Sequence, residues 1–158
     1  MNYDVIVLGS GPGGYVAAIR ASQLGLKTAV VEKESLGGIC LNWGCIPTKA
    51  LLKSANVFEY ITHAADYGIQ VADAKADFEG IIKRSRGVAT GMSGGVQFLM
   101  KKNKIDVHLG YGTLKPGKKI ELKGADGKVT ELTASHIIIA TGARSRELPN
   151  LKQDGKNI

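Results

Sequence analysis

The sequence has few of the residues that stabilise small secreted proteins. Among its 158 residues there are 2 cysteines, 4 prolines and 1 tryptophan, and aromatic residues make up 6%. Two cysteines cannot build the disulfide framework of a small extracellular domain. No apolar run approaches the roughly 20 residues that cross a bilayer, and no basic and apolar leader opens the chain. We therefore predict a cytoplasmic globular domain with one core and no membrane association.

Positive charge exceeds negative charge, and the excess is local. Lysine and arginine together number 21 against 14 acidic residues, a net charge of +7. The segment 101–128 contains eight lysines, one tyrosine and no arginine. Nucleic-acid surfaces combine arginines with stacking aromatic residues, so nucleic-acid binding is not predicted. A solvated face, or a surface that meets an acidic segment outside this chain, explains the charge equally well.

The first part of the chain follows the pattern of a βαβ unit. A β-branched run at 3–8 predicts a strand buried on both faces, and it leads directly into the glycine-rich segment 9–14. Apolar residues at helical spacing then continue to Gly25, and 28–32 predicts a second strand. This order predicts an α/β fold, a Rossmann-like domain with a mostly parallel sheet and flanking helices.

The rest of the chain is predicted to extend this sheet. After a loop at 33–39, the expected elements are helices over 42–65 and 77–100, and strands at 105–109, 119–122, 129–132 and 137–140. The strands at 119–122 and 129–132 flank a glycine-containing turn, which indicates a small antiparallel excursion. Frequent glycines in the second helix suggest close packing against another backbone, because each costs helix stability.

The end of the chain differs in composition from the rest. Residues 150–158 are polar and have no companion element, as in a linker between domains. We therefore assign 1–149 to one dinucleotide-binding domain and 150–158 to a linker.

The glycine-rich segment satisfies a dinucleotide fingerprint. Gly9 allows the tight turn, Gly11 lets the backbone approach a pyrophosphate, and Gly14 lets the helix pack on the strand. The helix amino terminus offers unpaired N–H groups to the phosphates. Glu32 follows at the end of the second strand, where its carboxylate can accept hydrogen bonds from both ribose hydroxyls. The pattern favours FAD or NAD; the alternative is a glycine-rich turn with an incidental glutamate.

Cys40 and Cys45 are the two cysteines. In a regular helix, residues five apart have Cα atoms about 8.7 Å apart, beyond the usual disulfide limit of about 7 Å. Gly44 and Pro47 provide the means to distort the backbone and bring the sulfurs together. Lys49 and a nearby helix amino terminus would stabilise a thiolate, as a redox-active pair requires. The alternatives are buried unreactive thiols and half of a metal site, although the three histidines lack the paired spacing of zinc ligands.

Together these motifs resemble a known family. They are Gly9-Ser10-Gly11-Pro12-Gly13-Gly14, Glu32, the run 38–49 (GICLNWGCIPTK) and 139–143 (IATGA). The chain resembles the amino-terminal portion of the class I pyridine nucleotide-disulfide oxidoreductases and, among them, is most similar to the dihydrolipoamide dehydrogenases. The resemblance implies an FAD-binding domain, followed by a linker toward an NAD-binding domain that lies outside this chain.

The resemblance also implies roles for individual residues. Cys40 would exchange with the dithiol substrate, and Cys45 would contact the flavin. The cofactor-binding residues would be Gly9, Gly11, Pro12, Gly13, Gly14, Glu32, Lys33, Gly38, Cys45, Lys49, Tyr111, Gly112, Thr141, Gly142 and Ala143. No metal site is implied.

The implied reaction converts dihydrolipoamide and NAD to lipoamide and NADH through FAD. The substrate would be carried on lipoyl domains of 2-oxo acid dehydrogenase complexes, and members of the family form homodimers. The family's catalytic base is a histidine followed by proline, and none of His63, His108 and His136 has that context. The NAD site is also absent from this chain, so we expect the chain alone to be inactive. Two other readings are a non-catalytic dinucleotide-binding module and a mercuric or glutathione reductase relative.

Overall fold

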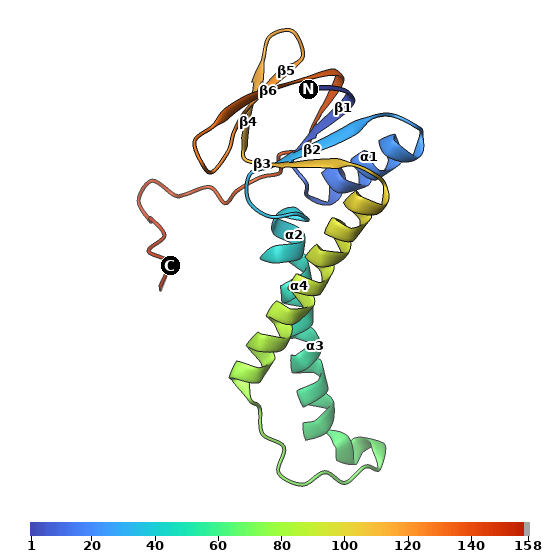
Figure 1. Ribbon diagram of the computed structural model, residues 1–158. Helices are drawn as coiled ribbons and strands as arrows, with labels where there is room; N and C mark the ends of the chain where they lie inside the picture. Colours follow the sequence, from blue (N-terminus) through green and yellow to red (C-terminus); the bar gives the residue numbers. More distant parts are fainter. Residues whose placement is uncertain (157–158) are drawn as a thin grey trace.

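The protein is an α/β domain built on one six-stranded sheet. The computed structural model describes residues 1–156 (Figure 1). The strands are ordered β3-β2-β1-β6-β5-β4 across the sheet. Their bounds are β1 Asn2–Leu8, β2 Thr28–Glu32, β3 Asp106–Leu109, β4 Tyr111–Lys115, β5 Lys119–Lys123 and β6 Val129–Ile139. The helices are α1 Pro12–Gln23, α2 Gly38–Asn42, α3 Cys45–Thr62 and α4 Phe78–Lys102, with a short 3-10 helix at Ala64–Tyr67. The predicted fold class is confirmed.

The parallel half of the sheet forms the core. β1 pairs in parallel with β2 on one side and β6 on the other, and β3 extends β2. All five residues of β2 are buried, as expected of a strand covered on both faces. One face packs on helices α1 and α4, and the other packs on apolar side chains of β5 and β6. The two strands predicted for the βαβ unit are confirmed.

β6 is one strand where the sequence predicted two. Val129–Thr133 pairs antiparallel with β5, and the rest of the strand continues in parallel beside β1. The apolar run at 137–140 predicts a buried strand, and this prediction is wrong, since Ile139 is 62% exposed. The antiparallel excursion is confirmed, and it includes an additional strand, β4, which pairs with β5. The single long strand therefore joins the parallel sheet to the antiparallel excursion.

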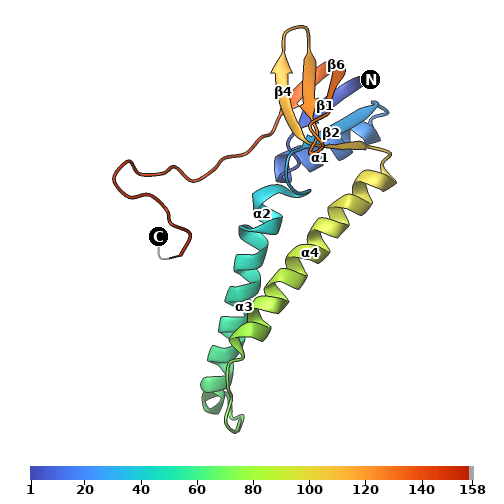
Figure 2. The same cartoon turned by 60° about the vertical axis from the view of Figure 1, so that its left-hand side comes forward.

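Helices α3 and α4 form an arm that projects from the sheet (Figures 1 and 2). α4 begins after Asp77, whose carboxylate accepts a hydrogen bond from the Gly80 amide, as in a standard N-cap. The predicted close packing of the α4 glycines is wrong for the described residues. A Cβ added at Gly87, Gly91, Gly94 or Gly95 would meet no atom within 4 Å, so this face of the helix is open.

The remaining segments carry little regular structure. Residues 33–37 form a loop. This loop is shorter than the one predicted at 33–39, because α2 begins at Gly38. From Thr141 to residue 156 the chain leaves the sheet, with one isolated bridge between Leu148 and Leu151 (Figure 2). The assignment of 150–158 to a linker stays a prediction, and residues 157–158 lie outside the described part. Within residues 1–156, no helix combines the length and apolar character needed to cross a bilayer.

Candidate functional site

A cleft of about 640 Å³ opens at the carboxyl ends of the parallel strands. Open α/β sheets bind ligands at this edge, and the volume lies within the ordinary range of cofactor pockets, about 300–1,000 Å³. The residues predicted for the site that line it are Gly9, Gly11, Pro12, Glu32, Lys33, Gly38, Cys40, Cys45, Tyr111, Gly112, Thr141, Gly142 and Ala143. Five chain segments thus converge on one cavity.

Three residues predicted for the site lie outside the cleft wall. Gly13 and Gly14 belong to the first turn of α1, with Gly14 buried behind the loop. Lys49 lies in the second turn of α3 with an exposed side chain and does not line the cleft. Lys49 is therefore four residues from the cleft-lining Cys45 in sequence, but it does not form part of the cleft wall.

The glycine loop is shaped by two close approaches. Gly9 has φ +99°, and a Cβ there would run into the backbone carbonyl of Ala140 at the end of β6. A Cβ at Gly14 would overlap the Gly9 carbonyl, which agrees with the predicted close packing of helix on strand. Pro12 then opens α1, at the position where its missing N–H costs no helix hydrogen bond. The N–H groups of Gly13 and Gly14 in the first turn have no partner within the helix, and no side chain caps this end of α1.

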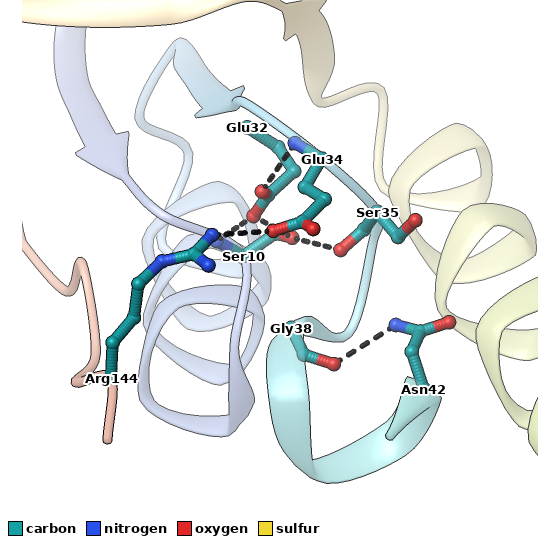
Figure 3. A network of polar contacts seen from close by, with 7 residues as sticks. All are labelled: Ser10, Glu32, Glu34, Ser35, Gly38, Asn42 and Arg144. Atoms are coloured by element: carbon teal, nitrogen blue, oxygen red, sulfur yellow. Dashed lines mark hydrogen bonds and ion pairs between the residues drawn. The ribbon is translucent and has the colours of Figure 1, made fainter. Parts of the chain in front are cut away.

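The Glu32 carboxylate is held in a fixed orientation (Figure 3). Its Oε2 accepts hydrogen bonds from the Ser10 amide at 2.9 Å and the Ser10 hydroxyl at 2.6 Å, and its Oε1 accepts one from the Glu34 amide at 2.9 Å. A carboxylate offers about four acceptor positions. Among the described residues, three are occupied, so the open one is on Oε1. The binding of ribose hydroxyls by Glu32 stays a prediction.

Two residues that line the cleft form an ion pair. Arg144, in the segment after β6, places its Nη2 atom 2.9 Å from Oε2 of Glu34, in the loop after β2 (Figure 3). Both side chains are about half exposed or more, at 67% and 47%, so the pair adds little stability by itself. Sequence reasoning missed Ser10 and Arg144. Ser10 occupies one of the three variable positions of the glycine fingerprint, and Arg144 carried no signal because its partner is distant in sequence.

The two cysteines form a disulfide in one wall of the cleft. Cys40 lies in α2 and Cys45 is the first residue of α3, with Cα atoms 4.6 Å apart. The chain interrupts the helix between them at Trp43 and Gly44, whose amides both donate to the Ile39 carbonyl. A Cβ at Gly44 would lie 3.1 Å from that carbonyl oxygen, a tight contact. The predicted distortion is confirmed, and it takes the form of two helices rather than one bent helix.

The loop before α2 is tied to α2 by one side chain. Asn42 donates through Nδ2 to the carbonyl oxygens of Leu36 at 3.0 Å and Gly38 at 2.9 Å. Figure 3 shows this amide turned back toward the start of α2. Cys40 is therefore carried on a short helix closed at both ends by hydrogen bonds.

A second polar cluster lies outside the cleft. The Tyr3 hydroxyl donates to Oδ2 of Asp106 at 2.9 Å and lies 2.9 Å from Nε2 of His108. Because its single proton is already donated, this contact is satisfied when His108 donates from Nε2. Burial raises the pKa of Tyr3 to about 12, and the hydrogen bond to Asp106 adds to the effect. Burial also lowers the pKa of His108 below its usual value, against the opposing charge of Asp106. Both groups therefore stay neutral near pH 7.

The histidines provide neither a cleft base nor a metal site. None of His63, His108 and His136 lines the cleft. Within the described residues, no group of three or more histidine, cysteine, aspartate or glutamate side chains is arranged to hold a metal ion. The cleft therefore combines a helix amino terminus, a fixed carboxylate and a disulfide.

Comparisons with known proteins agree with this geometry. The family model described as pyridine nucleotide-disulphide oxidoreductase matches residues 3–158. Dihydrolipoyl dehydrogenases of Rhizobium etli and Zymomonas mobilis are 54% and 53% identical over 99% of this chain, and the matches cover 36% and 34% of those proteins. The crystal structure of LpdA from Mycobacterium tuberculosis matches 96% of this chain and 34% of its own, at 27% identity and a TM-score of 0.87. The chain thus spans about a third of the length of the relatives it matches.

Proposed function

The chain belongs to the pyridine nucleotide-disulphide oxidoreductase family, and we propose that it is the FAD-binding part of a dihydrolipoyl dehydrogenase. In this role it exchanges electrons between a dithiol substrate and FAD through Cys40 and Cys45. One observation carries the proposal: the disulfide opens into the same cleft as the glycine loop and the Glu32 carboxylate. A nucleotide site and a redox couple in one cavity fit a flavin disulfide oxidoreductase better than a module that only binds a nucleotide.

The residues of the cleft fit a dinucleotide. The backbone amides at the start of α1, near Gly11 and Pro12, would hold the pyrophosphate, since no atom lies within 4 Å of a Cβ added at Gly11. The open acceptor position on Oε1 of Glu32 would take one ribose hydroxyl. Tyr111, Gly112 and the segment 141–143 would line the rest of the cofactor. When bound, FAD supplies a carrier that takes two electrons from the cysteine pair and passes them to NAD.

The cysteines would carry out a balanced thiol-disulfide exchange. A thiolate of dihydrolipoamide attacks the Cys40 sulfur, the disulfide breaks, and Cys45 leaves as a thiolate. The second substrate thiol, once deprotonated, displaces Cys40 from the mixed disulfide, which yields lipoamide and the reduced pair. Cys45 is the first residue of α3, where the helix dipole stabilises its negative charge.

The proton acceptor for the substrate would come from outside this chain. The exchange requires a base near the sulfur atoms, and no histidine of this chain lines the cleft among the described residues. The NAD site and a homodimer partner would likewise lie outside it, as would the lipoyl domains of 2-oxo acid dehydrogenase complexes that present the substrate. The chain alone is therefore expected to bind FAD and to exchange its disulfide without turning over dihydrolipoamide and NAD.

Two measurements on the purified chain test this proposal. Titration with FAD should quench flavin fluorescence with saturation, and Glu32→Ala should weaken that binding. Glu121→Ala, which changes a half-buried glutamate of β5 outside the cleft lining, should leave it unchanged. Counting of free thiols should give none before reduction and two after it. Absence of saturable FAD binding together with two permanently free thiols would reject the assignment. Retained binding of FAD with inert thiols would favour the non-catalytic module instead.

A further inference from the structure

Helix α4 directs side-chain donors at the segment that carries the two cysteines. The Ser93 hydroxyl donates to the Leu36 carbonyl at 2.6 Å, and Arg86 donates through Nη1 to the Asn42 carbonyl at 3.2 Å. The Ser85 hydroxyl donates to the Pro47 carbonyl at 3.2 Å. These three carbonyls lie before α2, at the end of α2 and in the first turn of α3. α4 therefore bonds both helices that bear the disulfide.

Two of these donors, Ser85 and Ser93, are polar residues on the buried stripe of α4. The buried stripe of the helix includes Ser85, Ala89, Val96 and Met100, and Ser93 lies on the same stripe, half-buried. An apolar side chain would satisfy the packing of such a stripe, whereas a hydroxyl there requires a partner. Both serine hydroxyls donate to backbone carbonyls of the cysteine-bearing segment and not to carbonyls of α4 itself. The buried stripe of α4 thus contacts that segment through hydrogen bonds as well as through packing.

The acceptors of Ser93 and Arg86 are carbonyls without a partner inside a helix, and that of Leu36 also accepts a hydrogen bond from Asn42 Nδ2. Leu36 lies outside any helix, and Asn42 is the last residue of α2, where a carbonyl has no partner within its own helix. Pro47, in contrast, is inside α3. Ser93 and Arg86 therefore fix the two ends of the short helix that carries Cys40.

We propose that Ser93 and Arg86 are positioning residues that keep Cys40 near Cys45 when the disulfide is reduced. The inference rests on the proposed redox role of this pair. In the oxidised protein the bond between the sulfurs holds α2 against α3 without help. Addition of two electrons and two protons breaks that bond, and α2 then stays in place through the short link at Trp43 and Gly44, the packing of the buried Leu41 and its hydrogen bonds to α4. Without those bonds the reduced pair gains freedom that the oxidised pair cannot gain, and the dithiol becomes more favourable.

The equilibrium with glutathione measures this effect directly on the full 158-residue chain. The protein disulfide and two glutathione thiols exchange to the protein dithiol and one glutathione disulfide, and acid trapping followed by mass spectrometry gives the populations. Loss of one net hydrogen bond of about 1 kcal/mol corresponds to a change of about fivefold. Ser93→Ala and Arg86→Met should each lower the constant for disulfide formation about fivefold, which equals about 20 mV for a two-electron couple.

Thr90→Ala is the matched control. The Thr90 hydroxyl donates to the carbonyl of Arg86 within α4 itself, at 3.0 Å, and so does not reach the cysteine segment. Thr90→Ala should leave the equilibrium constant unchanged. Ser93→Thr, which keeps a hydroxyl, should give a constant closer to that of the unsubstituted chain than Ser93→Ala does. Thermal unfolding of oxidised and reduced protein provides the second readout, because a merely structural role lowers both midpoints equally.

The outcomes separate this inference from the function on which it rests. Unchanged constants in both Ser93→Ala and Arg86→Met, with a normal constant in the unsubstituted chain, would overturn the positioning role alone. A chain whose cysteines form no disulfide at any glutathione ratio would overturn the proposed function and this inference with it. A lower constant in either variant, with Thr90→Ala unaffected, supports the role.

Discussion

The sheet around the cleft and the arm of α3 and α4 are stabilised in different ways. All five residues of β2 are buried, whereas the 18 residues of α3 include two buried ones, Pro47 and Ala50. The arm is joined to the cysteine segment by side-chain hydrogen bonds to backbone, and it exposes large apolar residues such as Leu52 and Phe78. Burial thus holds the nucleotide half of the cleft, while the disulfide half combines the packing of the buried Leu41 against α4 with side-chain hydrogen bonds to backbone. Four predictions test this difference, from the largest expected effect to the smallest.

Truncation in the sheet should be far more costly than truncation on the arm. Ile6 of β1 is fully buried, whereas Leu52 of α3 is 57% exposed. Ile6→Ala should lower the free energy of unfolding by about 3 kcal/mol, because it removes buried methyl groups and leaves a cavity. Leu52→Ala should change it by less than about 0.5 kcal/mol. Urea denaturation measures both, and similar losses would show that the arm is packed as tightly as the sheet.

Among polar substitutions in the cleft, removal of the Glu32 carboxylate should cause the largest loss of unfolding free energy. Glu32→Ala leaves the buried Ser10 amide without its acceptor, which costs about 2 kcal/mol of unfolding free energy. Glu34→Ala, which removes an exposed partner of Arg144, should cost less than about 0.5 kcal/mol. The two variants are compared by chemical denaturation. Equal costs would contradict a structural role for the Ser10–Glu32 bonds.

The polar cluster at Tyr3 should make stability depend on pH at both ends of the range. His108 has a lowered pKa, so its contribution to the free energy of unfolding is complete above about pH 6.5 and is lost as the pH falls through the folded-state pKa. Tyr3 has a raised pKa, so its contribution is complete below about pH 10 and is lost as the pH rises through about 12. Tyr3→Phe should lower the free energy of unfolding by about 1 kcal/mol near neutral pH. This difference from the unsubstituted chain should shrink above pH 10. Denaturation from pH 5 to 11.5 measures this, and a deficit constant to pH 11.5 would refute the prediction for Tyr3.

An alanine on the open face of α4 should stabilise the chain slightly. A Cβ at Gly91 would meet no atom within 4 Å, and alanine favours a helix over glycine by about 0.5–1 kcal/mol. Gly91→Ala should therefore raise the unfolding midpoint, whereas Gly14→Ala should lower it because its Cβ would overlap the Gly9 carbonyl. A destabilised Gly91→Ala variant would mean that another surface occupies this face in solution.

Much of the nucleotide half of the site was predictable because its signals are local. Gly9, Gly11 and Gly14 follow one another closely between a strand and a helix, and the positive φ of Gly9 and the approach of Gly14 to the Gly9 carbonyl are local constraints. The strand at 28–32 and the helix that follows Asp77 were likewise predictable from patterns of neighbouring residues, whereas the burial of β2 comes from distant elements. Prediction failed at β6, where 129–132 and 137–140 merged into one strand, because the polar residues between them are accommodated by two different partners, β5 and β1. The open glycine face of α4 was also mispredicted, since packing density depends on which elements happen to surround a helix.

The sequence by itself determined the βαβ unit, the fingerprint loop and the need for a distorted backbone between Cys40 and Cys45. These depend on φ/ψ preferences and on spacing within a few residues. Only the tertiary structure decided that Ser10 occupies Oε2 of Glu32, that Arg144 reaches Glu34, and that Ser93 bonds the segment before α2. Each of these contacts joins residues 22 to 110 positions apart. Contacts of that kind exist only after chain folding has brought the segments together, and no local preference encodes them.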